Sequence, residues 1–346
     1  MTRIARLAER LEQPLLVTKA ANIRYLTGLV DATNAMVLVE PTGEATLFTD
    51  FRYADAARAL DDVEFVQTAR SVVTTVSGAL GGRSVGFDPA HVTVAAYDEL
   101  RAGGVELTPA GGLVEALRAV KDAGELDAIR RAATLSDTLF GELAGERFVG
   151  RTERELAWWI DRRFRELGAE RSSFDTMVGF GEMGARPHGE ARDVPIPVGT
   201  MVVVDTGCVV DGYCSDCTRT FLTGDDARLL ELHALCLRAQ LDGLAAVKPG
   251  ARGRDVDAAS RVAIAEAGLA ERYGHGLGHG VGLEIHEGPS LRPESEDVLQ
   301  EGNIVTIEPG LYFDGDVGVR IEDLVLVTPD GAERLTTVTK EPIVVS

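Results

Sequence analysis

Hydrophobic and polar positions in the first third of the chain alternate between a strand pattern and a helical pattern. Residues 35–40 and 45–49 are short apolar runs separated by Pro41-Thr42-Gly43, which predicts a β-hairpin that turns at these three residues. A strand pattern at 84–87 and a helical pattern at 94–101 then follow. The first third is therefore predicted to be a small α/β domain.

After residue 120 the pattern becomes that of long amphipathic helices. Residues 125–144 and 152–167 have helical periodicity, and Thr152 with Glu155 forms the capping-box signature at the start of the second helix. The change of pattern predicts a domain boundary between residues 118 and 124.

The remainder of the chain repeats one design. A second pair of helical stretches, 226–247 and 253–268, precedes a second group of strands, as the first pair precedes the first group. We therefore expect an α+β protein with an N-terminal α/β domain at 1–118 and a domain of two duplicated halves at 119–346.

Composition narrows the classes of function. The chain has 346 residues, enough for two domains, and its 35 basic against 55 acidic residues leave a net charge of −20. Such a charge disfavours nucleic acid and anionic membrane surfaces as partners. The first residues have no secretion-signal pattern, and the longest apolar runs have the length of strands, so we expect a soluble, cytoplasmic protein.

Four cysteines are too few and too clustered to staple a chain of this length. Cys214 and Cys217 form a C-x-x-C pair, which also occurs in redox and zinc sites. No second pair and no helix start accompany it, so the pattern favours two strand residues that flank Asp216.

Two pairs of acidic residues straddle predicted turns. Asp205 ends a predicted strand at 200–205 and Asp216 lies near the start of another at 214–222, with Val209-Val210-Asp211-Gly212 between them. Residues equidistant from a hairpin turn face each other, so the two carboxylates are expected to converge. Facing anions require a cation or a proton between them.

The same arrangement recurs downstream. Glu308 ends a predicted strand at 303–308, Glu322 lies in a predicted strand at 318–328, and the midpoint between the two acids is Gly315. Two such pairs in one chain predict a cluster of four carboxylates, for which a pair of divalent metal ions is the natural neutraliser.

Histidines complete the candidate site. Three of the six lie in a glycine-rich segment, His275, His279 and His286, and His188 lies upstream. Oxygen-rich ligation with an imidazole suits manganese, cobalt or iron(II) better than structural zinc. The H-x-x-x-H spacing at 275–279 also occurs in zinc-protease helices, but the intervening glycines disfavour a helix. The two other histidines, at 91 and 233, are interpreted as structural.

These residues stand in motifs that resemble those of the pita-bread metallopeptidases, which include Xaa-Pro dipeptidase (prolidase), aminopeptidase P and methionine aminopeptidase. The motifs are Asp205-Thr206-Gly207, Ser215-Asp216-Cys217-Thr218-Arg219, Gly278-His279-Gly280-Val281-Gly282, Thr306-Ile307-Glu308-Pro309-Gly310 and Arg320-Ile321-Glu322-Asp323. Upstream, residues 22–28 and 47–53 resemble the creatinase-type N-terminal domain. The resemblance thus covers nearly the whole chain and implies a pita-bread domain with pseudo-twofold halves.

The resemblance also implies a ligand set and a mechanism. Two divalent metal ions, Mn²⁺ or alternatively Co²⁺, Fe²⁺ or Zn²⁺, are expected on Asp205, Asp216, His279, Glu308 and Glu322. In such enzymes a hydroxide that bridges the metals attacks the scissile carbonyl, and Glu308 is expected to handle its proton. One imidazole among His188, His275 and His286 is expected to stabilise the oxyanion, and the others to contact substrate.

Two arginines are further candidates. Arg320 lies two residues before Glu322, hence on the same face of the predicted strand, and is expected to orient a ligand carboxylate or to meet substrate. A structural salt bridge is the alternative. Arg292 is a weaker candidate for binding the free carboxylate of a dipeptide.

The compact N-terminal domain favours a dipeptidase that cleaves Xaa-Pro over an aminopeptidase P that acts on longer Xaa-Pro peptides. A metal-free creatinase-like hydrolase and a catalytically dead interaction module are less favoured, because all five expected ligands are present. A homodimer is implied by family likeness alone.

Overall fold

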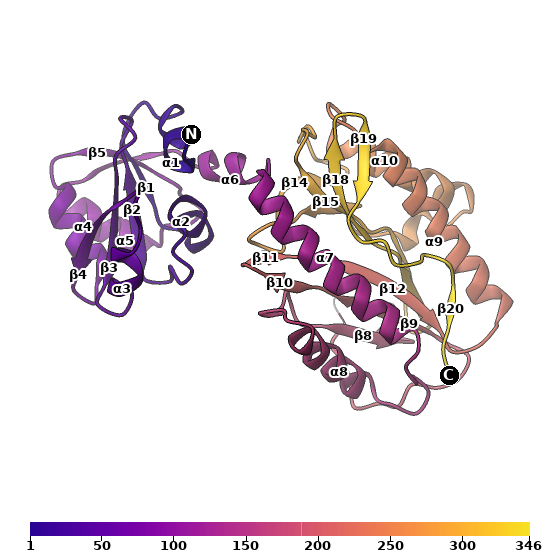
Figure 1. Ribbon diagram of the computed structural model, residues 1–346. Coiled ribbons are helices and arrows are strands. Elements are labelled where there is room, and N and C mark those ends of the chain that lie inside the picture. Colours follow the sequence, from indigo (N-terminus) through magenta and orange to yellow (C-terminus); the bar gives the residue numbers. More distant parts are fainter. Residues whose placement is uncertain (188) are drawn as a thin grey trace. The chain divides into compact units, whose positions relative to one another are not determined.

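The computed structural model describes residues 1–187 and 189–346. It divides into two compact units, Met1–Arg118 and Ala119–Ser346 (Figure 1). No helix within these described residues is both long and apolar enough to span a bilayer.

The first unit is built on a six-stranded mixed sheet with strand order β4-β3-β2-β1-β5-β6. β1, β5 and β6 run parallel to one another, whereas β2 pairs antiparallel with both β1 and β3. Its strands are β1 Leu15–Val17, β2 Ala35–Val39, β3 Ala45–Asp50, β4 Glu64–Thr68, β5 Ser84–Phe87 and β6 Glu106–Pro109. Its helices are α1 Arg3–Ala8, α2 Ala20–Thr27, α3 Ala54–Arg58, α4 Val72–Leu80, α5 Val94–Ala102 and α6 Leu113–Arg118.

The predicted elements of this unit are confirmed. β2 and β3 form the expected hairpin, with Val39 opposite Ala45, and β5 and α5 lie where the pattern placed them. Val76 of α4 and Leu100 of α5 are buried against one face of the sheet together with Phe48. Burial of such side chains, at roughly 25 cal/mol per Å² of apolar surface, holds the helices on the sheet.

The second unit contains two helix pairs and two larger sheets. The sheets have strand orders β20-β12-β9-β8 and β14-β13-β15-β18-β19. The helices are α7 Ala123–Leu143, α8 Glu153–Glu166, α9 Ala227–Ala246, α10 Gly253–Glu266 and the short 3₁₀ helix η1 Ala270–Arg272. The strands of the first half are β7 Arg171–Ser172, β8 Met177–Phe180, β9 Met201–Thr206, β10 Cys208–Val210, β11 Tyr213–Cys214 and β12 Cys217–Leu222. The remaining strands are β13 Gly278–Gly280, β14 Glu287–Leu291, β15 Ile304–Ile307, β16 Gly310–Phe313, β17 Val317–Arg320, β18 Asp323–Thr328, β19 Gly331–Arg334 and β20 Ile343–Val344.

The two halves of this unit repeat one plan. α7 and α8 precede the antiparallel pair β9–β12, and α9 and α10 precede the antiparallel pair β15–β18. An isolated β-bridge stands before the second helix of each pair, Thr152 with Pro195 and Arg252 with Val298. Figure 1 shows α9 and α10 side by side, and they pack on each other. The predicted duplication and the capping box at Thr152 are confirmed.

Two predicted strands are wrong in one respect, because each is interrupted at an acidic residue. The stretch 214–222 divides into β11 and β12, with Ser215 and Asp216 between them, and the stretch 318–328 divides into β17 and β18, with Ile321 and Glu322 between them. Each interruption removes one acid from the ladder and turns it toward the same cavity.

Candidate metal centre

A cavity of about 550 Å³ in the second unit brings the predicted ligands together. Its lining includes Asp205, Asp216, His279, Glu308 and Glu322. His275, His286, Arg292 and Arg320 line the same cavity. His188, the remaining predicted site residue, lies outside the described residues.

The first acid pair comes from β9 and the interruption before β12. Asp205 pairs with Thr218 across the ladder, so the expectation that Asp216 directly faces Asp205 is wrong. Both ladders of this hairpin are centred between Asp211 and Gly212, one position beyond the midpoint of Asp205 and Asp216, and the interruption at 215–216 leaves the register unchanged. Asp216 nevertheless reaches the cavity, since it is free of the ladder.

The second acid pair follows the expected turn. Phe313 pairs with Val317 and Ile307 with Asp323, so both ladders are centred on Gly315 as predicted. Glu308 and Glu322 lie in the matching gaps between these ladders. The expectation that Arg320 and Glu322 share one face of a continuous strand is wrong, because β17 ends at Arg320.

Thr218 joins the two halves at the site. Its carbonyl accepts a hydrogen bond of 3.1 Å from the backbone N–H of Glu322, and its hydroxyl donates to Oε2 of Glu322 at 2.7 Å. The four acids therefore converge where the duplicated halves meet.

The buried carboxylates of this site repel one another, so bound cations would stabilise them. One oxygen from each of Asp205, Asp216 and Glu322 lies within 4.8 Å of the other two. Burial raises the pKa of all three carboxyl groups, and repulsion from neighbouring carboxylates raises the pKa further. Among residues 1–187 and 189–346, Oδ1 of Asp205 and Oε1 of Glu322 are buried without a hydrogen-bond partner. Such unsatisfied buried oxygens are costly alone and are suitable ligands for hard divalent ions.

His279 presents the remaining donor. Its Nδ1 lies 3.1 Å from the carbonyl of Gly280 and, because a carbonyl only accepts, Nδ1 carries a proton. Nε2 lies 3.2 Å from Oε1 of Glu308 and 3.7 Å from Oδ2 of Asp216. Burial opposes ionisation of Glu308, but the imidazole prevails and lowers the pKa of Glu308 to about 2. A metal-binding imidazole has this arrangement, with one nitrogen fixed by a carbonyl and the other toward the ion.

Close backbone packing fixes β13, which carries His279. A Cβ atom at Gly278 would lie 2.0 Å from the carbonyl oxygen of Thr306, and one at Gly280 would lie 2.2 Å from that of Gly288. Both distances are far below van der Waals contact, so only glycine allows the backbone to approach here.

Arg320 contacts the carboxylate of Asp205 within a hydrogen-bond network that sequence reasoning missed. Its Nη2 donates to Oδ2 of Asp205 at 2.6 Å, and its Nη1 donates to the hydroxyl of Tyr312 at 2.9 Å. Tyr312 lies 2.9 Å from Nε2 of His275, and Nδ1 of His275 donates to the carbonyl of Gly276 at 2.7 Å. Both nitrogens of His275 are thus occupied, which argues against this residue as the oxyanion donor.

The position of Tyr312 beside Arg320 could have been predicted from the hairpin around Gly315. Gly310 pairs with Arg320 in the β16–β17 hairpin, so Tyr312, two residues along, lies on the same face and diagonal to Arg320.

The other predicted residues lie at or near the cavity. The centre of the His286 ring lies 4.4 Å from that of the His279 ring, edge to face, and Arg292 lines the cavity with an exposed side chain. Cys214 and Cys217 are buried free thiols in β11 and β12 that flank Asp216, as predicted.

Comparison with known proteins decides the family. The model of metallopeptidase family M24 matches residues 127–329, and that of the creatinase/prolidase N-terminal domain matches residues 3–120. The chain belongs to metallopeptidase family M24. It has the pita-bread fold that its motifs predicted.

Individual members of the family are similar over nearly their full length. An Xaa-Pro dipeptidase of Pyrococcus horikoshii is 33% identical over 333 residues, with 95% of this chain and 94% of the relative covered. The solved structure of an Xaa-Pro dipeptidase from Bacillus anthracis is 36% identical, with a TM-score of 0.94 and 99% of both chains covered. That of an X-Pro aminopeptidase from Thermotoga maritima is 30% identical, with a TM-score of 0.89 and coverage of 98% and 99%.

Proposed function

We propose that this M24 member is an Xaa-Pro dipeptidase that holds two divalent metal ions on Asp205, Asp216, His279, Glu308 and Glu322. The observation that carries the proposal is the buried carboxylate cluster with two unsatisfied oxygens. Isolated buried anions of this kind are not tolerated without counter-charge. When bound, such ions polarise a carbonyl and activate water. Oxygen-dominated ligation supports Mn²⁺ as the metal.

The chain's own residues then have distinct tasks. Glu308 is the candidate proton acceptor, because it lines the cavity and is held by Thr306, whose hydroxyl donates to Oε1 at 3.0 Å. Arg320 opposes the rise that burial causes in the pKa of Asp205, and it holds the carboxylate in place from a buried position. His286, and His188 by its motif, remain the candidates for contact with substrate and for the oxyanion, since His275 is occupied.

Arg292 is the candidate for recognition of the dipeptide. A free carboxylate directly after proline requires a cation at the cavity, and Arg320 already binds Asp205 and Tyr312. Arg292 lines the cavity and is exposed, and its guanidinium makes no hydrogen bond or ion pair within residues 1–187 and 189–346. A guanidinium can bind a carboxylate in a bidentate manner, which would favour dipeptides over longer chains.

A substrate panel tests the proposal. An Xaa-Pro dipeptide and the same sequence extended by two residues are compared in Mn²⁺, with the wild type and with Arg292→Gln. A charge-assisted contact of about 1.5 to 3 kcal/mol predicts at least roughly tenfold higher kcat/KM for the dipeptide. Arg292→Gln should remove most of this preference, whereas Arg254→Gln, at a partly exposed arginine outside the cavity lining, is the control. Equal or better cleavage of the extended peptide would identify an aminopeptidase P instead.

The same proposal extends to assembly and location. We propose a cytoplasmic homodimer, on the basis of family likeness and of four cysteines that are all free thiols. Sedimentation of the purified protein at several concentrations tests the dimer.

A further inference from the structure

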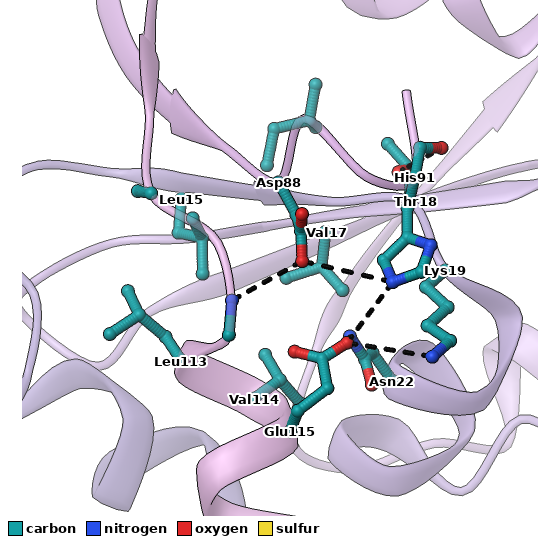
Figure 2. Close-up of a pocket in the computed structure, with 13 residues that line it drawn as sticks. Leu15, Val17, Thr18, Lys19, Asn22, Asp88, His91, Leu113, Val114 and Glu115 are labelled. Atoms are coloured by element: carbon teal, nitrogen blue, oxygen red, sulfur yellow. Dashed lines mark hydrogen bonds and ion pairs between the residues drawn. The ribbon is translucent and has the colours of Figure 1, made fainter. Parts of the chain in front are cut away.

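A second group of metal-ligating side chains lies in the first unit. Asp88, His91 and Glu115 each offer one atom, and these atoms all lie within 4.8 Å of one another. Nε2 of His91 is 3.5 Å from Oε1 of Glu115 and 3.9 Å from Oδ2 of Asp88. In Figure 2 the three side chains point toward one another. We propose that this cluster is a site for one divalent transition-metal ion of the Zn²⁺ class, separate from the metal centre of the second unit.

The position of the cluster in the fold favours a binding site. Asp88 directly follows β5, Lys19 follows β1, and Glu115 lies on α6, which follows β6. Because β1, β5 and β6 are parallel, their carboxyl ends meet at one edge of the sheet. In open α/β sheets ligands bind in the crevice beyond the carboxyl ends of the strands.

The size of the cavity selects an ion. The pocket beside these side chains has a volume of about 10 Å³. A single water-sized sphere needs roughly 10–15 Å³, whereas small organic ligands occupy pockets of roughly 300–1,000 Å³. The space therefore suits one ion, not a metabolite.

The donors have the chemistry and the spacing of such an ion. One imidazole nitrogen with two carboxylate oxygens can bind several first-row divalent ions, zinc among them, at bond lengths of roughly 2.0–2.2 Å for zinc. Tetrahedral ligands at these lengths are separated by roughly 3.4 Å, so the distances of 3.5 and 3.9 Å need to contract by at most about 0.5 Å. The three side chains are 20 to 28% exposed, which leaves a path for the ion.

Supporting contacts orient two of the donors. The backbone N–H of Ala90 donates to Oδ1 of Asp88 at 2.9 Å, and that of Gly112 donates at 3.4 Å to Oδ2, the oxygen that faces His91. Asn22 is buried and donates to Oε1 of Glu115 at 2.6 Å, and Arg118 in turn donates to Oδ1 of Asn22 at 2.7 Å. Hydrogen bonds to the ligands from such a second layer are typical of metal sites.

Lys19 is the competitor for this position. Its Nζ lies 3.8 Å from Oε1 of Glu115, so without a metal the ammonium neutralises part of the cluster (Figure 2). Bound metal and a nearby ammonium repel each other. Removal of the Lys19 charge should therefore tighten metal binding, which no ion-pair role of the cluster would produce.

Metal counting on the full-length protein tests the site. Wild type, His91→Ala, Glu115→Gln and the control Asp98→Asn, an exposed acid of α5, are dialysed against low micromolar Zn²⁺, and bound zinc is measured by mass spectrometry. We expect His91→Ala and Glu115→Gln to bind one ion per chain fewer than wild type and control. The difference is independent of how many ions the second unit holds, so it stands or fails separately from the peptidase proposal.

Further measurements separate a metal site from a structural ion pair. Circular dichroism and Xaa-Pro hydrolysis in Mn²⁺ should be unchanged in His91→Ala. Lys19→Met should bind the additional ion roughly tenfold more tightly. Equal zinc content in wild type and His91→Ala, or no gain in affinity in Lys19→Met, would show that the cluster is an ion pair only. If His91→Ala fails to fold, Glu115→Gln and Lys19→Met still decide the question.

Discussion

Two adjacent acidic residues of the second unit, Glu322 and Asp323, are equally buried and have opposite surroundings. Asp323 accepts a hydrogen bond from Arg219 at 2.8 Å and one from Gln240 at 3.1 Å, and its Oδ2 lies 2.9 Å from Nζ of Lys340. Burial raises the pKa of Asp323, but these cations prevail and lower it. Glu322 faces other carboxylates, and its pKa is raised. A buried acid whose partners are all present is structural, and one that lacks them is a candidate ligand.

The largest expected effect concerns the carboxylate cluster around Glu322, which has few cationic partners, and within it Glu308. Glu308→Gln keeps the shape of the side chain but removes the base, so turnover of an Xaa-Pro dipeptide should fall by roughly 10³-fold or more. Stopped assays in Mn²⁺ measure this loss, with metal content as a parallel readout. Turnover within tenfold of wild type would remove Glu308 from the mechanism.

The next effect concerns Asp323, whose charge is balanced by its cationic partners. Asp323→Asn leaves Arg219 and Lys340 buried without their anion, so the free energy of unfolding should fall by about 3 to 5 kcal/mol. Glu322→Gln is the matched neighbour: it removes a repelled charge and should lower metal content, with little loss of stability in the metal-free protein. Denaturant unfolding after chelation compares the two. The distinction between the neighbours fails if the two substitutions destabilise equally.

The pH dependence of stability should depend on His233, which is close enough to Arg219, the partner of Asp323, to be affected by its charge. This buried histidine of α9 has its pKa lowered from 6.5 to about 4, first by burial and then by the charge of Arg219, the cation that pairs with Asp323. Between pH 6.5 and 4 the histidine is protonated in the unfolded state and neutral in the folded state. The free energy of unfolding therefore decreases as the pH falls from 6.5 toward 4. The loss is about 3 kcal/mol, from roughly 1.4 kcal/mol per pH unit.

The test of this pH effect is a single substitution. His233→Gln should flatten the curve of unfolding free energy between pH 6.5 and 4, whereas the partly exposed His91→Gln serves as control. A curve of unchanged slope in His233→Gln would assign the acid sensitivity to other groups.

The smallest effect concerns the fine positioning of Asp205. Tyr312→Phe removes one hydrogen bond to Arg320 and one to His275, which should lower kcat/KM by roughly tenfold with metal content retained. Val319→Ala, a change in the same hairpin that leaves the hydroxyl in place, is the control for general loosening. A Tyr312→Phe enzyme that also loses metal would indicate a larger role for this tyrosine.

Much of the fold and the site followed from local sequence rules. Helices α7 to α10 were predicted because each is long and periodic, and the pair Glu308 and Glu322 because both ladders are centred on Gly315. The pairing of Asp205 was missed, although the Asp211-Gly212 turn centres the hairpin between these two residues and so places Thr218 opposite Asp205.

Contacts between distant segments were beyond such rules. Arg219 and Asp323 are 104 positions apart, and each appeared in a motif without a role assigned to it. His91 was interpreted as a structural loop histidine, because its partner Glu115 is selected by the order of strands in the sheet and not by spacing along the chain. The identity of a partner thus depends on topology, which periodicity does not reveal.

The close backbone packing around β13 limits which substitutions the protein can accept there. With 2.0 and 2.2 Å between a substituted Cβ and the neighbouring carbonyl oxygens, any side chain at Gly278 or Gly280 would force the strand apart and carry His279 away from Glu308. Saturation libraries at these two positions should therefore return glycine alone among active clones. Attempts to change the metal preference by directed evolution would therefore have to keep both glycines and vary other positions.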